Sequence, residues 1–215
     1  YTLWHTLSLH DALPILDTLN TDTAVHLDGV TDFTVSGIQV ETADTAVIVA
    51  NPSGTTQAGR LNSITVNDAS TGISISGSSN LLLQSVQLDG NGEPPEDPEV
   101  EPGPPGALGV ELTNSDDIEL DSPSIVDFVT GLDVQGGANG LLDSASLERV
   151  DQAGNFSDTD GFTVTAGTFK ALKNGLRFTN VENTTVDGAV IQLPASGDGL
   201  IGFSVNNPAA VSSGN

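Results

Sequence analysis

Small residues stand at regular intervals along this chain, and apolar residues follow each of them in a fixed pattern. Counted from each small residue, the apolar positions are the first, third, ninth, eleventh, fourteenth and sixteenth. Most intervals are 22 residues, and the two longer ones, of 26 and 37, contain insertions. A shorter unit is expected from Gly199. The seven full units begin at Ala24, Ala46, Gly72, Gly109, Gly131, Ala153 and Gly175.

Each unit predicts three short strands with one buried face, because apolar and polar residues alternate within each run. Only two residues separate the second and third strands, as in Ser36-Gly37 and Asp187-Gly188. Small or polar pairs of this kind favour sharp bends. One unit cannot enclose a core by itself, whereas stacked units can. The pattern therefore predicts an all-β solenoid of about eight coils, whose strands pair in parallel at a spacing of about 4.8 Å.

Two stretches, Thr31–Val40 and Asn80–Leu88, carry a resemblance to a known family. They resemble the generic 22-residue repeat of the right-handed parallel β-helix in the pectin-lyase-like superfamily, and the likeness extends over nearly all of residues 23–205. The resemblance implies that fold and an extracellular or cell-surface location. Because enzymes, adhesins and phage tailspikes share the fold, it implies no single activity. Asp158–Phe162 resembles an element of the polygalacturonase branch, but the branch's Asn is replaced and its histidine motif is missing.

The domain organisation follows from where the repeat holds. Residues 1–15 break the pattern and resemble translated read-through of a sequencing adaptor, so we expect them to lie outside the fold. Residues 16–215 are expected to form a single β-helix, with turn insertions at 51–59 and 93–106. The second insertion is rich in proline and acidic residues and should be solvated. The first residue is not methionine, and the last unit, from Gly199, stops after about 17 residues, so we expect a fragment truncated at both ends.

Charge narrows the classes of partner. The net charge is -24, from 29 acidic and five basic residues. Nucleic acid and anionic membrane surfaces are therefore disfavoured, since both are bound through lysine and arginine. Calcium and neutral glycans remain compatible. The chain has no cysteine, and no apolar run approaches the roughly 18 residues of a membrane-spanning helix.

The sharpest candidate for chemistry lies on the outer face of the first strand. Glu111 and Asp133 stand there in consecutive units, so their carboxylates are expected about 5 Å apart. Such a pair could bind calcium or act as acid and nucleophile in a retaining glycosidase. The resemblance implies a related arrangement in calcium-dependent lyases, with a basic residue as proton acceptor. Arg177 is the candidate for that role, two coils away. The alternative is a solvated acidic face.

Three further columns repeat from unit to unit. Asp121 and Asp143 stand at the tight turn, where they could hold a cation or serve turn hydrogen bonds. A second column precedes the second strand and is predicted to adopt left-handed turn conformations: Asp32, Asn80, Asp117, Asn139 and Asn183. The third column is an uncharged outward strip on the third strand, suited to a glycan, to ice or to ordinary β surface: Gln39, Thr65, Gln87, Ser124, Ser146 and Thr168.

The sequence favours a non-catalytic extracellular module of a larger surface or secreted protein, an adhesin or spacer that contacts polysaccharide or another cell. It requires no cofactor. The alternative is a calcium-dependent polysaccharide lyase or glycoside hydrolase that uses Glu111 and Asp133. The oligomeric state is left open.

Overall fold

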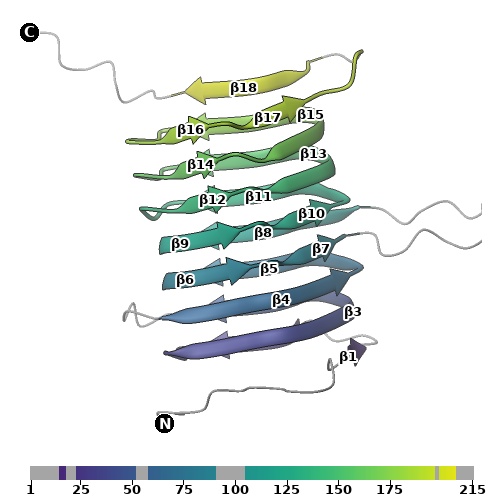
Figure 1. The fold of residues 1–215 in the computed structure, drawn as a ribbon, viewed down its shortest axis with the longest axis vertical. Coiled ribbons are helices and arrows are strands. Elements are labelled where there is room, and N and C mark those ends of the chain that lie inside the picture. The colour runs from purple at the N-terminus through teal and green to yellow at the C-terminus, as the bar shows by residue number, and fades with distance from the viewer. Residues whose placement is uncertain (1–14, 18–22, 52–57, 91–104, 197–198, 207–215) are drawn as a thin grey trace, which may run out of the picture.

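The predicted strands form, and strands of consecutive repeats lie side by side in parallel. The computed structural model describes residues 15–17, 23–51, 58–90, 105–196 and 199–206. These residues contain strands and no helix, stacked as a β-solenoid of about seven turns. Figure 1 shows the coils rising in chain order, from purple at the N-terminal end to yellow at the C-terminal end. The turn number is slightly below the expected eight because the first and last described strands, Ile15–Asp17 and Ile201–Asn206, each belong to an incomplete turn.

The first strand of each repeat builds one continuous parallel sheet, called here the first sheet. In spatial order it contains β2 (Thr23–Asp28), the end of β3 (Phe33–Ala50), β5 (Ala69–Ser76), β8 (Gly106–Thr113), β11 (Phe128–Gln135), the end of β13 (Ser146–Ser157), the end of β15 (Thr168–Thr179) and β18 (Ile201–Asn206).

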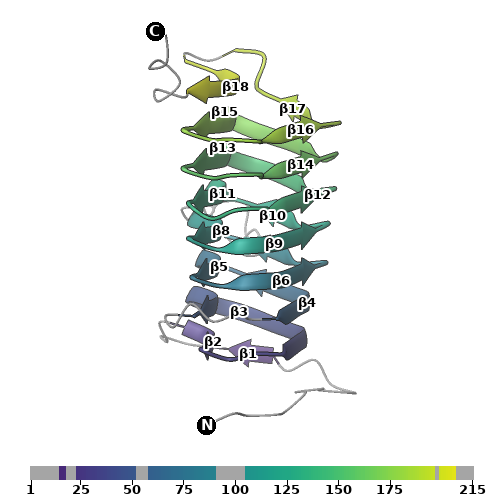
Figure 2. The ribbon, with the colours of Figure 1, turned by 90° about the vertical axis from the view of Figure 1, so that its left-hand side faces the viewer.

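The second and third sheets complete the walls of the solenoid (Figure 2). The second sheet contains the start of β3, the start of β4 (Gly59–Asn67), β6 (Ser79–Gln84), β9 (Asp116–Asp121), β12 (Leu141–Asp143), β14 (Thr163–Thr165) and β16 (Thr185–Asp187). The third contains β1 (Ile15–Asp17), the middle of β3, the end of β4, β7 (Gln87–Asp89), β10 (Ser124–Val126), the starts of β13 and β15, and β17 (Val190–Gln192).

Some strands are longer than predicted. β3 runs through 18 residues and contributes to all three sheets, and β13 and β15 continue from the third sheet into the first. At some of these corners a single left-handed residue lies within the strand, as Gly37 does in β3 and Arg149 in β13, and no separate turn forms. The expectation of three short strands therefore holds for the faces but not for every corner.

The register between coils follows the repeat. The small residues that open the seven units lie one above another, and Gly109 shows why they are small: a Cβ there would lie 2.5 Å from the carbonyl oxygen of Gly131 on the next coil. The expected start of the last unit at Gly199 is wrong. Leu176 pairs with Phe203, so Gly202 occupies the starting position, and Gly199 lies in the preceding turn with φ 73°.

The core fills the space between the three sheets. The six apolar positions of the third unit are at most 2% exposed: Ile73, Ile75, Leu81, Leu83, Val86 and Leu88. Near the C-terminal end the core becomes aromatic. The rings of Phe156 and Phe178 are stacked with centroids 4.7 Å apart, and Phe178 contacts Phe203 at 5.4 Å.

Left-handed residues mark the corners. All five members of the predicted column, Asp32 to Asn183, have φ between 46° and 56°. The tight turn between the second and third sheets has a similar column, which includes Ser122, Ser144 and Ala166. Short polar side chains and glycine accept this conformation at low cost, and they repeat here because every coil bends at the same place.

Candidate functional site

The predicted acidic pair lies on the outer face of the first sheet. Glu111 on β8 and Asp133 on β11 are direct neighbours across the parallel ladder, and both side chains are half-buried. Ser74 Oγ donates a hydrogen bond to Glu111 Oε2 at 2.8 Å. Asp133 accepts from Asn155 Nδ2 at 2.7 Å and from Gln135 Nε2 at 2.9 Å. Each carboxylate is therefore oriented by neutral donors.

Arg177 lies on the same face but not beside the pair. It pairs with Asn155, which in turn pairs with Asp133, so two coil spacings, about 10 Å, separate Arg177 from the nearer carboxylate. The Arg177 side chain is exposed. The structure thus brings Glu111 and Asp133 together and leaves Arg177 apart from them.

The second acidic pair lies at the tight turn between the second and third sheets. Asp121 and Asp143 are neighbours on β9 and β12. Gln84 Nε2 donates to Asp121 Oδ2 at 2.9 Å, and Thr165 Oγ1 donates to Asp143 Oδ1 at 2.6 Å. Each bond joins two consecutive coils within the same polar column at the turn.

Metal ligands are sparse around both pairs. No group of three or more His, Cys, Asp or Glu side chains that could hold a metal ion occurs in the described ranges. A calcium ion needs six to eight oxygen ligands. Either pair would have to recruit amide, hydroxyl or water oxygens to reach that number.

The third candidate is the uncharged column on the third sheet, here called the polar strip (Gln39, Thr65, Gln87, Ser124, Ser146 and Thr168). Its members pair directly from coil to coil along the ladder. A shallow hollow of about 190 Å³ lies over three of these coils, at Thr65, Gln87 and Ser124. Asn67 and Asp89 line its edge. Amide, hydroxyl and carboxylate groups thus border one surface depression.

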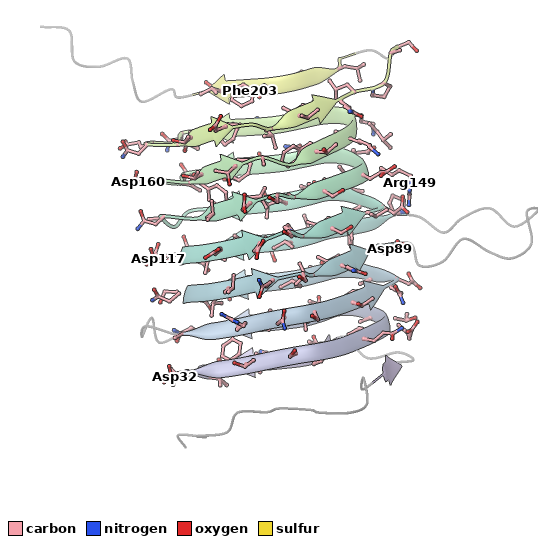
Figure 3. The ribbon with its side chains drawn as sticks, viewed as in Figure 1. Asp32, Asp89, Asp117, Arg149, Asp160 and Phe203 are labelled. Carbon is pink, nitrogen blue, oxygen red and sulfur yellow. The ribbon has the colours of Figure 1, made fainter. Side chains whose placement is uncertain are left out.

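A set of ion pairs at one corner was not predicted from the sequence. Three pairs, called here the corner ladder, join consecutive coils across separations of 22 residues: Asp127–Arg149, Glu148–Lys170 and Asp151–Lys173, at 2.5, 3.0 and 2.6 Å. Figure 3 shows Arg149 at the same edge of the solenoid as Asp89, opposite Asp32, Asp117 and Asp160. Opposite charges 22 positions apart were the signal that could have revealed these pairs.

The corner ladder also changes the titration of one residue. Hydrogen bonds from the guanidinium to Asp127 raise the pKa of Arg149 above its ordinary value, while partial burial opposes the shift. The arginine therefore stays charged at every pH at which the protein would be used.

Parts of two predictions lie outside the described residues. These are residues 1–14 of the adaptor-like segment and most of the turn insertions, residues 52–57 and 93–104. Ile15, the last residue of the adaptor-like segment, begins β1 and pairs with Gln39. No helix in the described part of the chain is long and apolar enough to cross a membrane.

Comparison of the chain with models of protein families gives no match, and neither does comparison with curated proteins.

Proposed function

We propose that this chain is a non-catalytic module of a surface or secreted protein, which acts as a rigid spacer and contacts neutral polysaccharide through the polar strip. The observation that carries the proposal is the hollow of about 190 Å³ on that strip, lined by Thr65, Gln87 and Ser124. An extracellular location and membership of the pectin-lyase-like superfamily are part of the same proposal.

The chemistry of the strip suits a sugar polymer. Hydroxyl and amide groups both donate and accept hydrogen bonds, as sugar hydroxyls do. Strands in a sheet lie about 4.8 Å apart, so the strip offers one such group per coil in a straight row. A polymer with repeating hydroxyl groups can contact several coils at once, and the individually weak contacts then add.

The charge of the chain supports a neutral ligand. At a net charge of -24, an anionic polymer would be repelled. Asp89 and Asn67 also line the hollow, and their carboxylate and amide oxygens are acceptors for sugar hydroxyls.

A pull-down with insoluble neutral polysaccharides, cellulose and chitin among them, tests the proposal. We expect the folded chain to sediment with at least one of them. The double variant Thr65→Asp with Ser124→Asp should abolish that sedimentation, because two negative charges replace neutral hydroxyl groups of the strip. Thr163→Asp, on the outer face of the second sheet, is the matched control and should still bind. Failure to bind any neutral polysaccharide, or equal binding by the strip variant, would overturn the proposal.

The alternative function is a calcium-dependent lyase or hydrolase of acidic glycans. The register of Glu111 and Asp133 favours it, because the two carboxylates face the same side one coil apart. This function predicts calcium-dependent formation of unsaturated or reducing ends from a uronate polymer. That activity would be lost in Glu111→Gln and in Asp133→Asn, with circular dichroism as the check on folding.

A further inference from the structure

The chain contains two sequences of the form Asn-X-Ser/Thr in which X is not proline, Asn155-Phe156-Ser157 and Asn183-Thr184-Thr185. This form is the acceptor for N-linked glycosylation, in which a sugar is attached to the asparagine amide of a secreted protein at its surface. Such short sequences also arise by chance. Whether either one can act as an acceptor therefore depends on where the fold places it.

The sequence at Asn155 lies inside a strand that has neighbours on both sides. Asn155 pairs with Asp133 on one adjacent coil and with Arg177 on the other. It is half-buried, and its Nδ2 donates a hydrogen bond to Asp133 Oδ1 at 2.7 Å. The middle residue, Phe156, is fully buried. An enzyme that has to hold the three residues along its own surface could reach them only if β13 left the sheet.

The sequence at Asn183 lies at the corner between the first and second sheets. Glu182 forms an isolated bridge with Asp160 on the coil below. Asn183 follows in a left-handed conformation with φ 46°, and Thr185 is the first residue of β16. Asn183 and Thr185, the two residues that define the acceptor, are both exposed.

This exposure is a property of the corner. Asn80, Asp117 and Asn139 occupy the same place in earlier coils, and all three are exposed although another coil lies above each of them. A group attached to this column therefore extends away from the rod and does not press on the next coil.

We propose that Asn183 is an acceptor for N-linked glycosylation by a transferase that uses a polyprenyl-diphosphate oligosaccharide. The inference rests on the extracellular location that is part of the proposed function. In the reaction, Asn183 Nδ2 forms a bond to the anomeric carbon of the sugar. The bond from that carbon to the diphosphate breaks, and the diphosphate leaves with the electron pair. The amide loses one proton to a base, and nothing is oxidised or reduced.

The hydrogen bond of Asn183 is compatible with the modification. Its Nδ2 donates to Asp160 Oδ1 at 2.7 Å. An asparagine amide carries two hydrogens on nitrogen, and one of them is kept after glycosylation. The glycosylated side chain can therefore still donate to Asp160.

The site is also far from the polar strip. Figure 3 shows Asp160, the partner of Asn183, at the edge of the solenoid opposite Asp89, which lines the hollow on the strip. A glycan on Asn183 would therefore leave that hollow open to a polysaccharide.

Sugar transfer to the purified, folded full chain tests the proposal. The reagents are a single-subunit oligosaccharyltransferase and a dolichyl-diphosphate oligosaccharide, and the readout is mass spectrometry of the intact chain and of its peptides. We expect the chain to gain one oligosaccharide, at Asn183, and none at Asn155.

Three variants separate the acceptor from the structure around it. Asn183→Asp removes the amide but keeps a residue type that the same column accepts at Asp32 and Asp117, so it should fold and gain no sugar. Thr185→Val should also gain none. Thr184→Val is the matched control, because it keeps the acceptor sequence and should be glycosylated as the wild type is. Circular dichroism checks that all three are folded.

Absence of transfer to the folded wild-type chain would overturn the inference, as would transfer that persists in Asn183→Asp or that occurs at Asn155 instead. The polysaccharide pull-down measures the strip and not Asn183, so the two proposals can fail separately. A chain that gains sugar at Asn183 but binds no polysaccharide would overturn only the binding function of the strip. A chain that binds polysaccharide but gains no sugar would overturn only the inference about Asn183.

Discussion

Arg149 donates two hydrogen bonds to Asp127 on the preceding coil, from Nε at 2.7 Å and from Nη2 at 2.5 Å. The arginine makes this contact from a left-handed backbone with φ 53°, a conformation that long side chains seldom adopt. Arg149 thus combines an ion pair between coils with an unfavourable backbone conformation. Substitutions of this residue can separate the effects of the two on stability.

Replacing Arg149 by alanine should cost more stability than replacing it by glycine. Both changes remove an ion pair worth about 0.2–1 kcal/mol at an exposed site. Only glycine also removes the left-handed strain, which is about 1 kcal/mol. We expect the glycine variant to match the wild type in urea denaturation and the alanine variant to unfold at lower urea. An alanine variant as stable as the glycine variant would contradict the left-handed assignment.

The sign of the pH dependence at this pair follows from the raised pKa of Arg149. A raised folded-state pKa means that the stabilisation is fully present below the unfolded-state pKa and is lost only as the pH rises through the folded-state value. The arginine side of the pair therefore contributes no pH dependence near neutrality.

Ala166 offers the reverse test, because a substitution there should stabilise the protein. Its φ is 55° and its side chain is exposed, so glycine removes backbone strain without a loss of packing. We expect Ala166→Gly to raise the free energy of unfolding by about 0.5–1 kcal/mol in urea titration. The matched control is Ala145→Gly, at a buried residue without a left-handed backbone, which should destabilise the protein. Equal effects of the two changes would refute the argument.

Leu83 and Leu82 are adjacent residues that differ in the face of the strand they occupy. Leu83 is fully buried, whereas Leu82 lies on the outer side of β6 and is only partly buried. Leu83→Ala should cost about 2–5 kcal/mol, as large-to-small changes in a core do. Leu82→Ala should cost well under half as much. Thermal unfolding of both variants checks the prediction, and a larger loss for Leu82 would mean that the register of the second sheet is wrong.

The fold should survive removal of calcium. The carboxylates of Glu111, Asp133, Asp121 and Asp143 each accept a hydrogen bond from a neutral side chain, which orients them without a cation. We therefore expect the circular dichroism spectrum and the cooperative melt to persist in EDTA. Loss of the cooperative transition in EDTA, with recovery on adding calcium, would show that a cation is structural. Loss of that recovery in Asp133→Asn would then locate the cation at the first sheet.

The faces of the strands were predictable because alternation and the 22-residue period both act locally. The left-handed column from Asp32 to Asn183 was predictable for a similar reason, since Asn and Asp are among the few residues that accept that conformation. The same reasoning placed Glu111 beside Asp133, because one coil spacing follows directly from the period.

The start of the last coil was not predictable by the same route. The turn before β18 separates it from β17, whereas β13 and β15 run from the third sheet into the first without a break, and Gly199 within this turn resembles a unit start. Counting from Gly199 instead of Gly202 displaces the strand by an odd number of residues, which moves its side chains to the opposite face. The apolar alternation of Ile201, Phe203 and Val205 would have been the better guide, but an incomplete unit gives few positions to fit.

The corner ladder was missed because it depends on side chains that the apolar pattern ignores. The hollow on the polar strip was missed because it arises from three coils together, at Thr65, Gln87 and Ser124, and not from any one segment.

Because each coil packs on the next in the same way, the number of coils in this protein can change during evolution. Because the contact between neighbours is nearly the same at every level, deleting or duplicating one 22-residue unit, such as residues 131–152, would bring equivalent residues into contact again. A shift of one residue within a strand would instead turn its core side chains outward, whereas extra residues in a turn, as in the 37-residue interval before Gly109, leave the register unchanged. The length of this rod can therefore vary by recombination between repeats while its architecture is preserved.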